Sequence, residues 1–153
     1  MAEGDIVIYN DFKEQILSKW HDLSSGGDTL KLTLHTSYTP NIDTHQVWAD
    51  TGVSSTEYGT ASGYTAGGKT LGSQTVTQDD TNDRALFDAA DVTWTALGAL
   101  SPATPGHAIL WNDSTTTPTD SLICYVELGT TATNGGDYTI AWDTSPSAII
   151  SLT

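Results

Sequence analysis

Basic residues are scarce in this chain of 153 residues. Lys and Arg together number 5 against 19 Asp and Glu, which gives a formal net charge of −14 at pH 7, and no Lys or Arg follows Arg84. A surface this acidic repels nucleic-acid phosphates and anionic lipid headgroups. We therefore expect no nucleic-acid partner and no membrane partner, whereas metal ions or basic protein surfaces suit the charge better.

Cysteine is nearly absent, and long apolar runs are missing altogether. The one cysteine, Cys124, lies in the apolar segment LICYVEL, where a free thiol behaves as a small buried hydrophobe, and it has no disulfide partner within the chain. No apolar run reaches about 18 residues, and the N-terminus MAEGDIVIYN lacks the basic start and apolar stretch of a secretory signal. We expect a soluble protein made in a reducing cytoplasm.

Strong helix formers are also scarce. Glu, Lys and Arg are few while Thr, Ser and Gly are abundant, which disfavours helices and suits β-strands and turns. Five Trp and six Tyr can fill a compact β core. The length of 153 residues is that of one domain, and no linker divides the sequence.

One segment near the N-terminus has the spacing of a helix. Apolar residues three to four positions apart line up along one helical face; they are Tyr9, Phe12, Ile16, Trp20 and Leu23. Asp11 and Glu14 resemble a capping box with Asp as the first member. The pattern predicts one helix that ends near the segment SSGGD. The residues before Asn10 either belong to this helical segment or form an extended arm.

From Thr29 onward the apolar period changes to two. Leu30, Leu32 and Leu34 alternate with polar residues, which is typical of a strand with one buried face. Similar segments follow at residues 74–78, 84–88, 92–97, 107–112, 122–128, 138–143 and 148–152, separated by polar turn clusters. Residues 36–73 lack a clear period and are predicted to be a long, partly ordered excursion.

These patterns predict a mainly β fold. We expect an antiparallel β-sandwich, or jelly-roll-like domain, with one N-terminal helix and a long irregular excursion. Residues 1–28 would form an N-terminal arm and amphipathic helix. Residues 29–153 would form a single β-sandwich domain with the irregular insertion at about 36–73.

The segment GYTAGGKT, residues 63–70, matches the phosphate-binding loop pattern G-x-x-x-x-G-K-[ST]. Such a loop binds a nucleoside triphosphate only where it links a buried strand to a helix. The preceding residues, TGVSSTEYGTAS, are polar and small, and the following LGSQTVTQDD alternates as a strand does. We interpret residues 63–70 as a glycine-rich loop that leads into a strand, and expect no cofactor.

No pattern of metal ligands stands out in the sequence. Residues 79–88 are rich in side-chain oxygens but lack the central glycine and terminal glutamate of a calcium loop, so an acidic β-turn is the simpler interpretation. The histidines are too far apart for H-x-x-x-H or H-x-H spacing; they are His21, His35, His45 and His107. We expect no metal site.

No catalytic residues are predicted. The sequence has no G-x-S-x-G motif, and Cys124 lies within a predicted strand and not at a helix start. Trp48, Trp94, Trp111 and Trp142 are candidates for a sugar-stacking platform, but only Trp48 lies outside the predicted strands. We expect a protein that is not an enzyme.

Several phrases together resemble a family of small virion structural proteins of tailed bacteriophages. They extend from about residue 6 to the end of the chain and are DIVIYNDF, LKLTLHTSYTPNIDTHQVWAD, GYTAGGKTL, TNDRALFDAADVTWTALG, HAILWND, LICYVELG and NGGDYTIAWD. Within this group the chain most resembles a head decoration, or cement, protein. The phrases are structural, so the resemblance implies no catalytic residues.

The resemblance implies a protein that binds the outer surface of a phage capsid and stabilises the shell by bridging capsomers, often as a homotrimer. The implied partners are the major capsid protein and further copies of the chain. The implied location is the capsid exterior of the virion, after synthesis in the host cytoplasm. A phage neck or tail-associated structural protein and a glycan-binding adhesin module stay open as alternatives.

We expect partner contacts from the apolar run near the N-terminus and from the irregular region. Termini are ordered only when they are tied down, and an extended run can add as a strand to a neighbouring chain. The predicted contact residues are Ile6, Val7, Ile8, Tyr9, Phe12 and Trp48.

Overall fold

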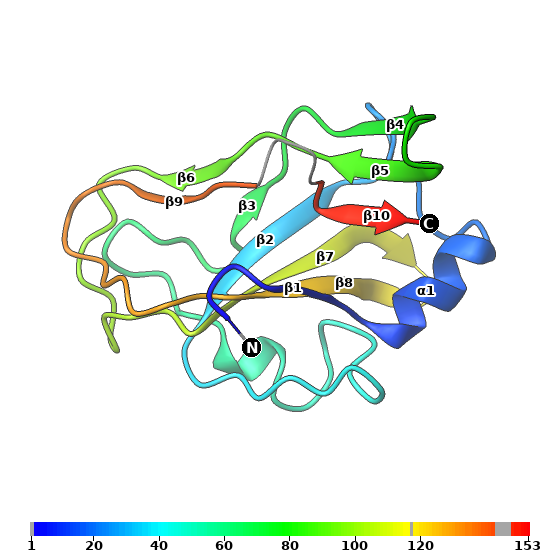
Figure 1. Cartoon of the computed structure of the whole chain (residues 1–153). Coiled ribbons are helices and arrows are strands. Elements are labelled where there is room, and N and C mark those ends of the chain that lie inside the picture. The colour runs from blue at the N-terminus through cyan, green and yellow to red at the C-terminus, as the bar shows by residue number, and fades with distance from the viewer. Residues whose placement is uncertain (1, 117, 143–147) are drawn as a thin grey trace.

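A five-stranded antiparallel sheet forms the middle layer of the structure (Figure 1). The structure is a computed structural model that describes residues 2–116, 118–142 and 148–153. The strand order is β1-β8-β7-β2-β3, with β1 at Ile6–Ile8, β2 at Leu30–His35, β3 at Lys69–Thr70, β7 at His107–Thr116 and β8 at Thr119–Glu127. The β7–β8 hairpin is central, and β1 and β3 are the edges.

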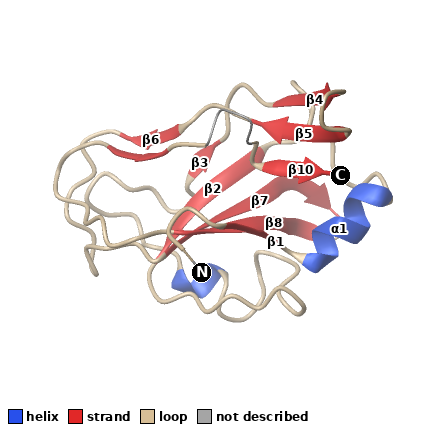
Figure 2. Cartoon of the chain, viewed as in Figure 1, coloured by secondary structure: helices blue, strands red, loops and turns tan. Residues whose placement is uncertain are grey.

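Two smaller antiparallel sheets cover one face of the middle sheet (Figure 2). One has the order β10-β5-β4, with β4 at Thr75–Asp79, β5 at Arg84–Asp88 and β10 at Ile150–Leu152; the other pairs β6 (Val92–Trp94) with β9 (Tyr138–Ile140). Each of these strands overlaps a segment predicted from alternation, although β9 ends at Ile140 and residue 143 lies outside the described residues. The predicted antiparallel β-sandwich with one helix is confirmed.

The main hydrophobic core lies between the middle sheet and these two sheets. Leu30, Leu32 and Leu34 of β2 are fully buried in it, as their two-residue period predicts. Phe87 of β5 and Trp94 of β6 fill the core from the other side. Packing of this apolar surface holds the two layers of the sandwich together.

The opposite face of the middle sheet is buried as well, so the prediction of one buried face for β2 is wrong. Thr33 and His35, which alternate with the leucines, are fully buried. The cover is the chain between β2 and residue 60, with the 3-10 helix η1 (Ser54–Thr56), which lies below the sheet in Figure 1. A second core joins it to the sheet and contains Tyr9, Tyr38, Val53, Ile109, Trp111, Leu122 and Tyr125. The first part of the predicted excursion, up to residue 60, therefore forms a third layer, whereas its last part supplies β3 (Lys69–Thr70) of the middle sheet.

The residues before the helix are extended, as one of the two sequence interpretations expected. They form β1, which pairs with β8 of the same chain in the register Ile6↔Val126 to Ile8↔Cys124. The run Ile6–Ile8 is thus ordered by its own sheet and not by a neighbouring chain. Part of the predicted N-terminal arm, Ile6–Ile8, consequently belongs to the middle sheet of the domain.

The helix α1 is shorter than the helical spacing predicts. It covers Asn10–Leu17, and Lys19 then takes a positive φ of 62°, which a helix does not tolerate. Trp20 lies beyond the helix and is exposed. The predicted capping box is absent, because no side chain caps the helix start and the Asp11 carboxylate accepts a hydrogen bond from Gln15. Among the described residues, no helix has the length and apolar content needed to cross a membrane.

The turn before β3 requires a glycine. Gly68 has a φ of +67°, and a Cβ at this position would lie 2.1 Å from the carbonyl oxygen of Leu32. We expect Gly68→Ala to lower the free energy of unfolding by about 2 kcal/mol or more, measured by urea denaturation, since both the dihedral and the backbone clash oppose a side chain. Gly59→Ala is the control, because a Cβ there meets nothing within 4 Å. Equal effects of the two substitutions would contradict close packing of residue 68 on β2.

Candidate functional site

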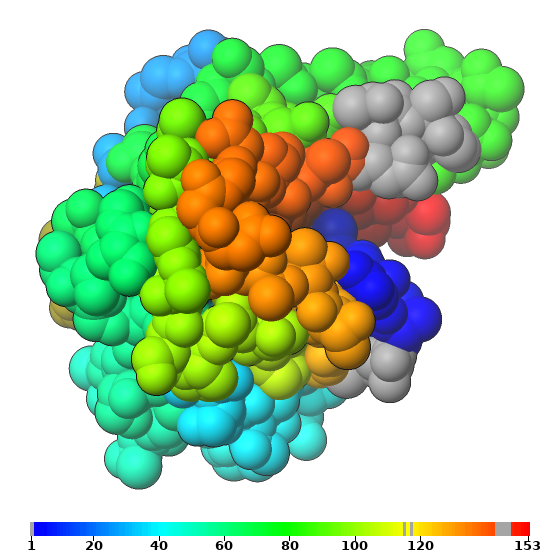
Figure 3. Space-filling model, turned by 90° about the vertical axis from the view of Figure 1, so that its left-hand side faces the viewer, coloured from blue at the N-terminus to red at the C-terminus, as the bar shows by residue number. Residues whose placement is uncertain are grey.

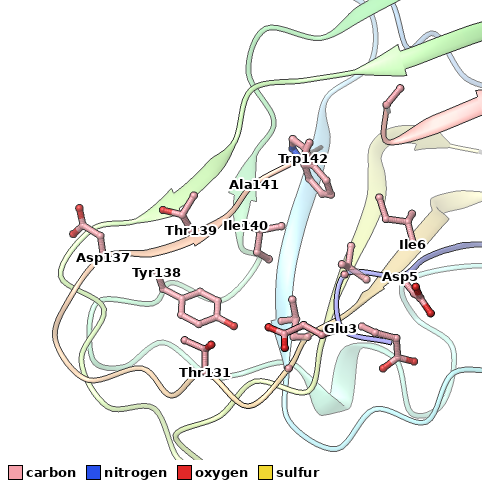
Figure 4. Close-up of a pocket in the computed structure, with 16 residues that line it drawn as sticks. Glu3, Asp5, Ile6, Thr131, Asp137, Tyr138, Thr139, Ile140, Ala141 and Trp142 are labelled. Atoms are coloured by element: carbon pink, nitrogen blue, oxygen red, sulfur yellow. The ribbon is translucent and has the colours of Figure 1, made fainter. Parts of the chain in front are cut away.

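A groove runs between the edge strand β1 and β9 (Figure 4). Its volume is about 740 Å³, within the range of about 300 to 1,000 Å³ typical of ligand sites. The segment that leads into β1, the end of β8 and the chain of β9 line it. In the space-filling view the N-terminal segment, in blue, lies beside the orange segment that carries β9 (Figure 3). The groove therefore follows an open side of the sandwich.

Acidic side chains border this groove, and none of the described residues that line it is Lys or Arg. The acidic residues are Glu3, Asp5, Glu127 and Asp137. The Glu3 carboxylate lies so close to Gly129 that a side chain at position 129 would collide with it. Burial and the charge of Glu3 raise the pKa of Tyr138, whose hydroxyl points toward Glu3 in Figure 4. We call this feature the acidic groove.

The edge strand β1 presents unpaired backbone groups beside the acidic groove. Asp5 accepts a backbone hydrogen bond from Glu127, and the Tyr9 N–H donates to the Ile123 carbonyl. Bonded and non-bonded residues alternate along an antiparallel pair, so the N–H and C=O groups of Ile6 and Ile8 point away from β8. A row of unpaired groups at a sheet edge is a template for a further strand.

A second surface lies at the end of the molecule away from β9. Four large apolar side chains are exposed there: Leu17 (85%), Trp20 (43%), Val76 (53%) and Leu152 (46%). They belong to α1, the turn after it, β4 and β10, which lie together on the right of Figure 1. An adjoining apolar groove of about 270 Å³ contains Val76, Phe87 and Leu152. Of the four, Val76 and Leu152 share this groove, whereas Trp20 lines a separate hollow with Gln46 and Pro118. Exposed apolar side chains are typical of contact surfaces. We call this surface the apolar end.

The predicted partner contacts do not come together in one surface. Tyr9 and Phe12 are buried in the second and main cores of their own chain, so neither side chain is available to a partner in this fold. Ile6 and Ile8 are half-buried against the main core, and Val7 is half-buried against the second core. Of this N-terminal run, Ile6 lines the acidic groove. A partner role for these side chains and for Trp48 stays a prediction.

Trp48 lies against the sheet and anchors the third layer. Its ring stacks on Trp111 of β7, with ring centroids 4.7 Å apart and planes inclined by 16°. Its backbone N–H donates to the Asp120 carbonyl of β8 at 2.9 Å. Trp94, Trp111 and Trp142 are buried, as their strand positions predict. These four tryptophans therefore do not form an exposed platform for a sugar.

Residues 63–70 form a turn beside β2 that leads into β3, as predicted. The Tyr64 hydroxyl accepts a hydrogen bond from the Leu34 N–H and donates one to Glu57, which holds the turn on the sheet. Lys69 donates to the Thr93 carbonyl at 2.6 Å, so its ammonium group is already bonded to a neighbouring strand. β4 follows β3, and no helix begins after Thr70 in this part of the described chain. The segment lacks the strand-to-helix geometry of a phosphate-binding loop.

Reactive side chains of the middle sheet are buried. The Cys124 thiol is fully buried, which raises its pKa to about 12. His35 lies between two hydroxyls, with Nε2 2.9 Å from Thr33 Oγ1 and Nδ1 3.0 Å from Thr56 Oγ1. Burial, and secondarily the nearby His107, lower the pKa of His35 to about 3. At neutral pH His35 is therefore an uncharged structural bridge between β2 and the third layer.

The acidic segment that begins at residue 79 is a tight turn between β4 and β5. Asp79 accepts hydrogen bonds from the backbone N–H groups of Thr81 and Asn82 and from the Arg84 Nε, the last at 2.8 Å. Hydrogen bonds from Asn82 and Arg84 lower the pKa of Asp79. The predicted acidic β-turn is confirmed. Within the described ranges, no three His, Cys, Asp or Glu side chains gather as ligands for a metal ion.

Apart from Ile6, which lines the acidic groove, sequence reasoning missed the residues of both surfaces. Glu3 and Asp137 lie at opposite ends of the chain, and nothing in their spacing links them before β1 is placed beside β8. The apolar end left a weak signal. Leu17 falls outside the apolar stripe of the predicted helix, and Val76 is the one apolar residue of the segment 74–78.

A scan against protein-family models, a search of curated proteins and a search of solved structures give no match to this chain.

The buried His35 makes stability depend on pH. Its pKa in the folded chain is about 3 against an ordinary value of 6.5, so between these values the unfolded chain binds a proton that the folded chain does not. The free energy of unfolding therefore falls as the pH falls, by up to about 1.4 kcal/mol per pH unit for one such histidine. We expect His35→Gln to flatten this slope between about pH 7 and pH 5, measured by urea denaturation.

Part of the pH dependence of the free energy of unfolding should persist in the His35→Gln variant. Burial also lowers the pKa of His21, to about 4, and this histidine is unchanged in the variant. The measurement is therefore the difference between the two slopes and not the slope of either protein alone. Equal slopes would contradict the placement of His35 as a buried, uncharged bridge.

Proposed function

We propose that this chain is a bacteriophage head decoration, or cement, protein. It binds the outer capsid surface as a homotrimer and stabilises the shell by bridging capsomers. The observation that carries this proposal is an acidic β-sandwich with two separate candidate surfaces for contacts, the acidic groove and the apolar end. A protein that bridges neighbours needs at least two such surfaces, because each contact holds a different subunit.

The sequence resemblance to small virion structural proteins supports the same role. Two of the phrases that carry it, DIVIYNDF and NGGDYTIAWD, supply walls of the acidic groove, including Asp5, Ile6, Tyr138 and Trp142. Bridging requires no reaction chemistry. The thiol of Cys124 is buried and its pKa is raised, which suits a structural residue better than a nucleophile.

Electrostatics favour different partners for the two surfaces. Copies that each carry a formal charge of −14 repel one another, so contact between copies needs apolar surface. The apolar end offers such surface, and Lys13 and Lys19 reduce the negative charge of α1 and the turn after it. The acidic groove suits a basic region of the major capsid protein. Each contact need be only modest, since a trimer that touches several capsid subunits gains from effective concentration.

The alternatives differ in copy number and in surface chemistry. A neck or tail-associated structural protein would use the same surfaces but be present in a few copies per particle, whereas a decoration protein is comparable in number to the capsid subunits. A glycan-binding adhesin has less support. The aromatic rings expected to stack on sugars are buried or, for Trp48, stacked on Trp111.

Phage particles that lack this protein should assemble but release DNA at a lower temperature than complete particles. The reason is that a bridged shell expands or sheds a subunit only by breaking many contacts together. Release is measured by the fluorescence of a DNA-binding dye during heating. Addition of the purified protein should restore the higher release temperature.

A matched pair of variants tests the contact between copies in the same assay. Leu17→Gln with Val76→Thr removes apolar surface at the apolar end and should restore the particles less well than the natural sequence. Gln78→Thr, at a polar position of the same strand β4, should restore them fully. Equal robustness of particles with and without the protein would refute the decoration role, as would a location only in the tail by cryo-electron microscopy.

A further inference from the structure

We propose that the acidic groove binds an extended, basic segment of a partner polypeptide, which adds as a further strand to the open edge of β1. The identification of that partner as a capsid protein rests on the proposed function. The form and charge of the occupant follow from the groove itself.

The backbone of β1 determines the form of the occupant. Among the described residues, β1 pairs with β8 on one side only, and the N–H and C=O groups of Ile6 and Ile8 face the open side. An extended segment satisfies such groups with main-chain hydrogen bonds, as in other cases of strand addition. A folded domain could do so only through an open edge strand of its own.

The carboxylates of the groove determine the charge of the occupant. The Glu127 Oε2 atom lies 3.1 Å from the His107 Nε2 atom, and the Asp137 carboxylate accepts a hydrogen bond from the Ala96 N–H. These two carboxylates therefore already have a partner within the fold. Glu3 and Asp5 are exposed and belong to the segment that leads directly into β1. Asp5 Oδ2 accepts a hydrogen bond from the nearby Ala2 N–H at 2.7 Å, and a carboxylate can accept further hydrogen bonds at its remaining lone pairs. Lys or Arg side chains on an added strand would form charge-assisted hydrogen bonds with the carboxylates of Glu3 and Asp5.

The wall opposite β1 determines which residues alternate with the basic ones. Tyr138, Ile140 and Trp142 line this wall, along the same stretch of chain in Figure 4. Tyr138 is half-buried, whereas Ile140 and Trp142 are buried in the main core beneath the groove. Successive side chains of an extended segment point to opposite faces. If alternate residues of the occupant are Lys or Arg and lie near Glu3 and Asp5, the residues between them point to the opposite face. Apolar side chains at these intervening positions suit the wall. The volume of about 740 Å³ suits a short segment and not a domain.

Calorimetric titration of the intact protein with three short capped peptides at low salt tests this inference. The probes are an alternating Lys-Val peptide, an alternating Glu-Val peptide, and the Lys-Val peptide with all of its backbone nitrogens methylated, so that neither edge can donate. Methylation keeps the charge but removes backbone donors, so it separates strand addition from charge attraction alone. We expect the unmethylated Lys-Val peptide to bind at least about tenfold more tightly than either of the others.

Two charge-matched double variants locate the binding site. Glu3→Gln with Asp5→Asn should weaken binding of the Lys-Val peptide by about tenfold. Asp80→Asn with Asp83→Asn removes the same charge at the turn between β4 and β5 and should leave the affinity within about twofold. All four positions are exposed, so the variants keep the fold. The amide resonances of Ile6 and Ile8 should shift during a titration followed by nuclear magnetic resonance.

Three results would overturn the inference. They are the absence of binding by the Lys-Val peptide, equal affinity of its methylated and unmethylated forms, and equal losses in the two double variants. A second measurement separates this inference from the proposed function: binding of the purified protein to phage particles that were assembled without it. Peptide binding without particle binding refutes the capsid partner alone, whereas particle binding without peptide binding refutes the groove inference alone.

Discussion

Burial of the β7–β8 hairpin on both faces is the constraint on which the rest of the structure depends. Leu110 and Cys124 pair across the hairpin and point into the main core, while Ile109 and Tyr125 pair and point into the second core. A sheet with two apolar faces is stable in water only when both are covered. The two smaller sheets cover one face, and the excursion covers the other.

Covering both faces leaves the edges and one end of the sandwich for contacts. The third layer is fixed by aromatic packing, with Trp48 stacked on Trp111, and by the hydrogen bonds of His35 to Thr33 and Thr56. These residues hold the fold together. The acidic groove at β1 and the apolar end near α1 remain as the contact surfaces of the proposed decoration protein.

Local sequence patterns predicted the strands better than they predicted the layers. The two-residue period of Leu30, Leu32 and Leu34 correctly placed β2, because alternation depends on the residues of the strand itself. The burial of Thr33 and His35 depends on a segment without any period, so local pattern could not predict it. The helix was predicted too long because Trp20 has helical spacing but follows a positive φ at Lys19.

The candidate site was harder to predict, because it is made by distant segments. The apolar run Ile6–Ile8 correctly indicated an extended segment near the N-terminus, but its pairing with β8 follows from the tertiary fold. Glu3 and Asp137 meet at one groove only after that pairing. Tyr9 and Phe12 were chosen as contacts for their apolar character, and the same character buries them in the two cores.

Native-state hydrogen exchange tests the central claim, a sheet closed on both faces and open at the edge of β1. Amides of buried strands exchange only through global unfolding, whereas unbonded amides at an edge exchange through small local fluctuations. The account predicts strong protection for Ile109 and Leu110, and much weaker protection for Ile6 and Ile8 than for Val7, which lies between them on β1. Equal protection of Ile6, Val7 and Ile8 would mean that the edge is already occupied, and would contradict the account.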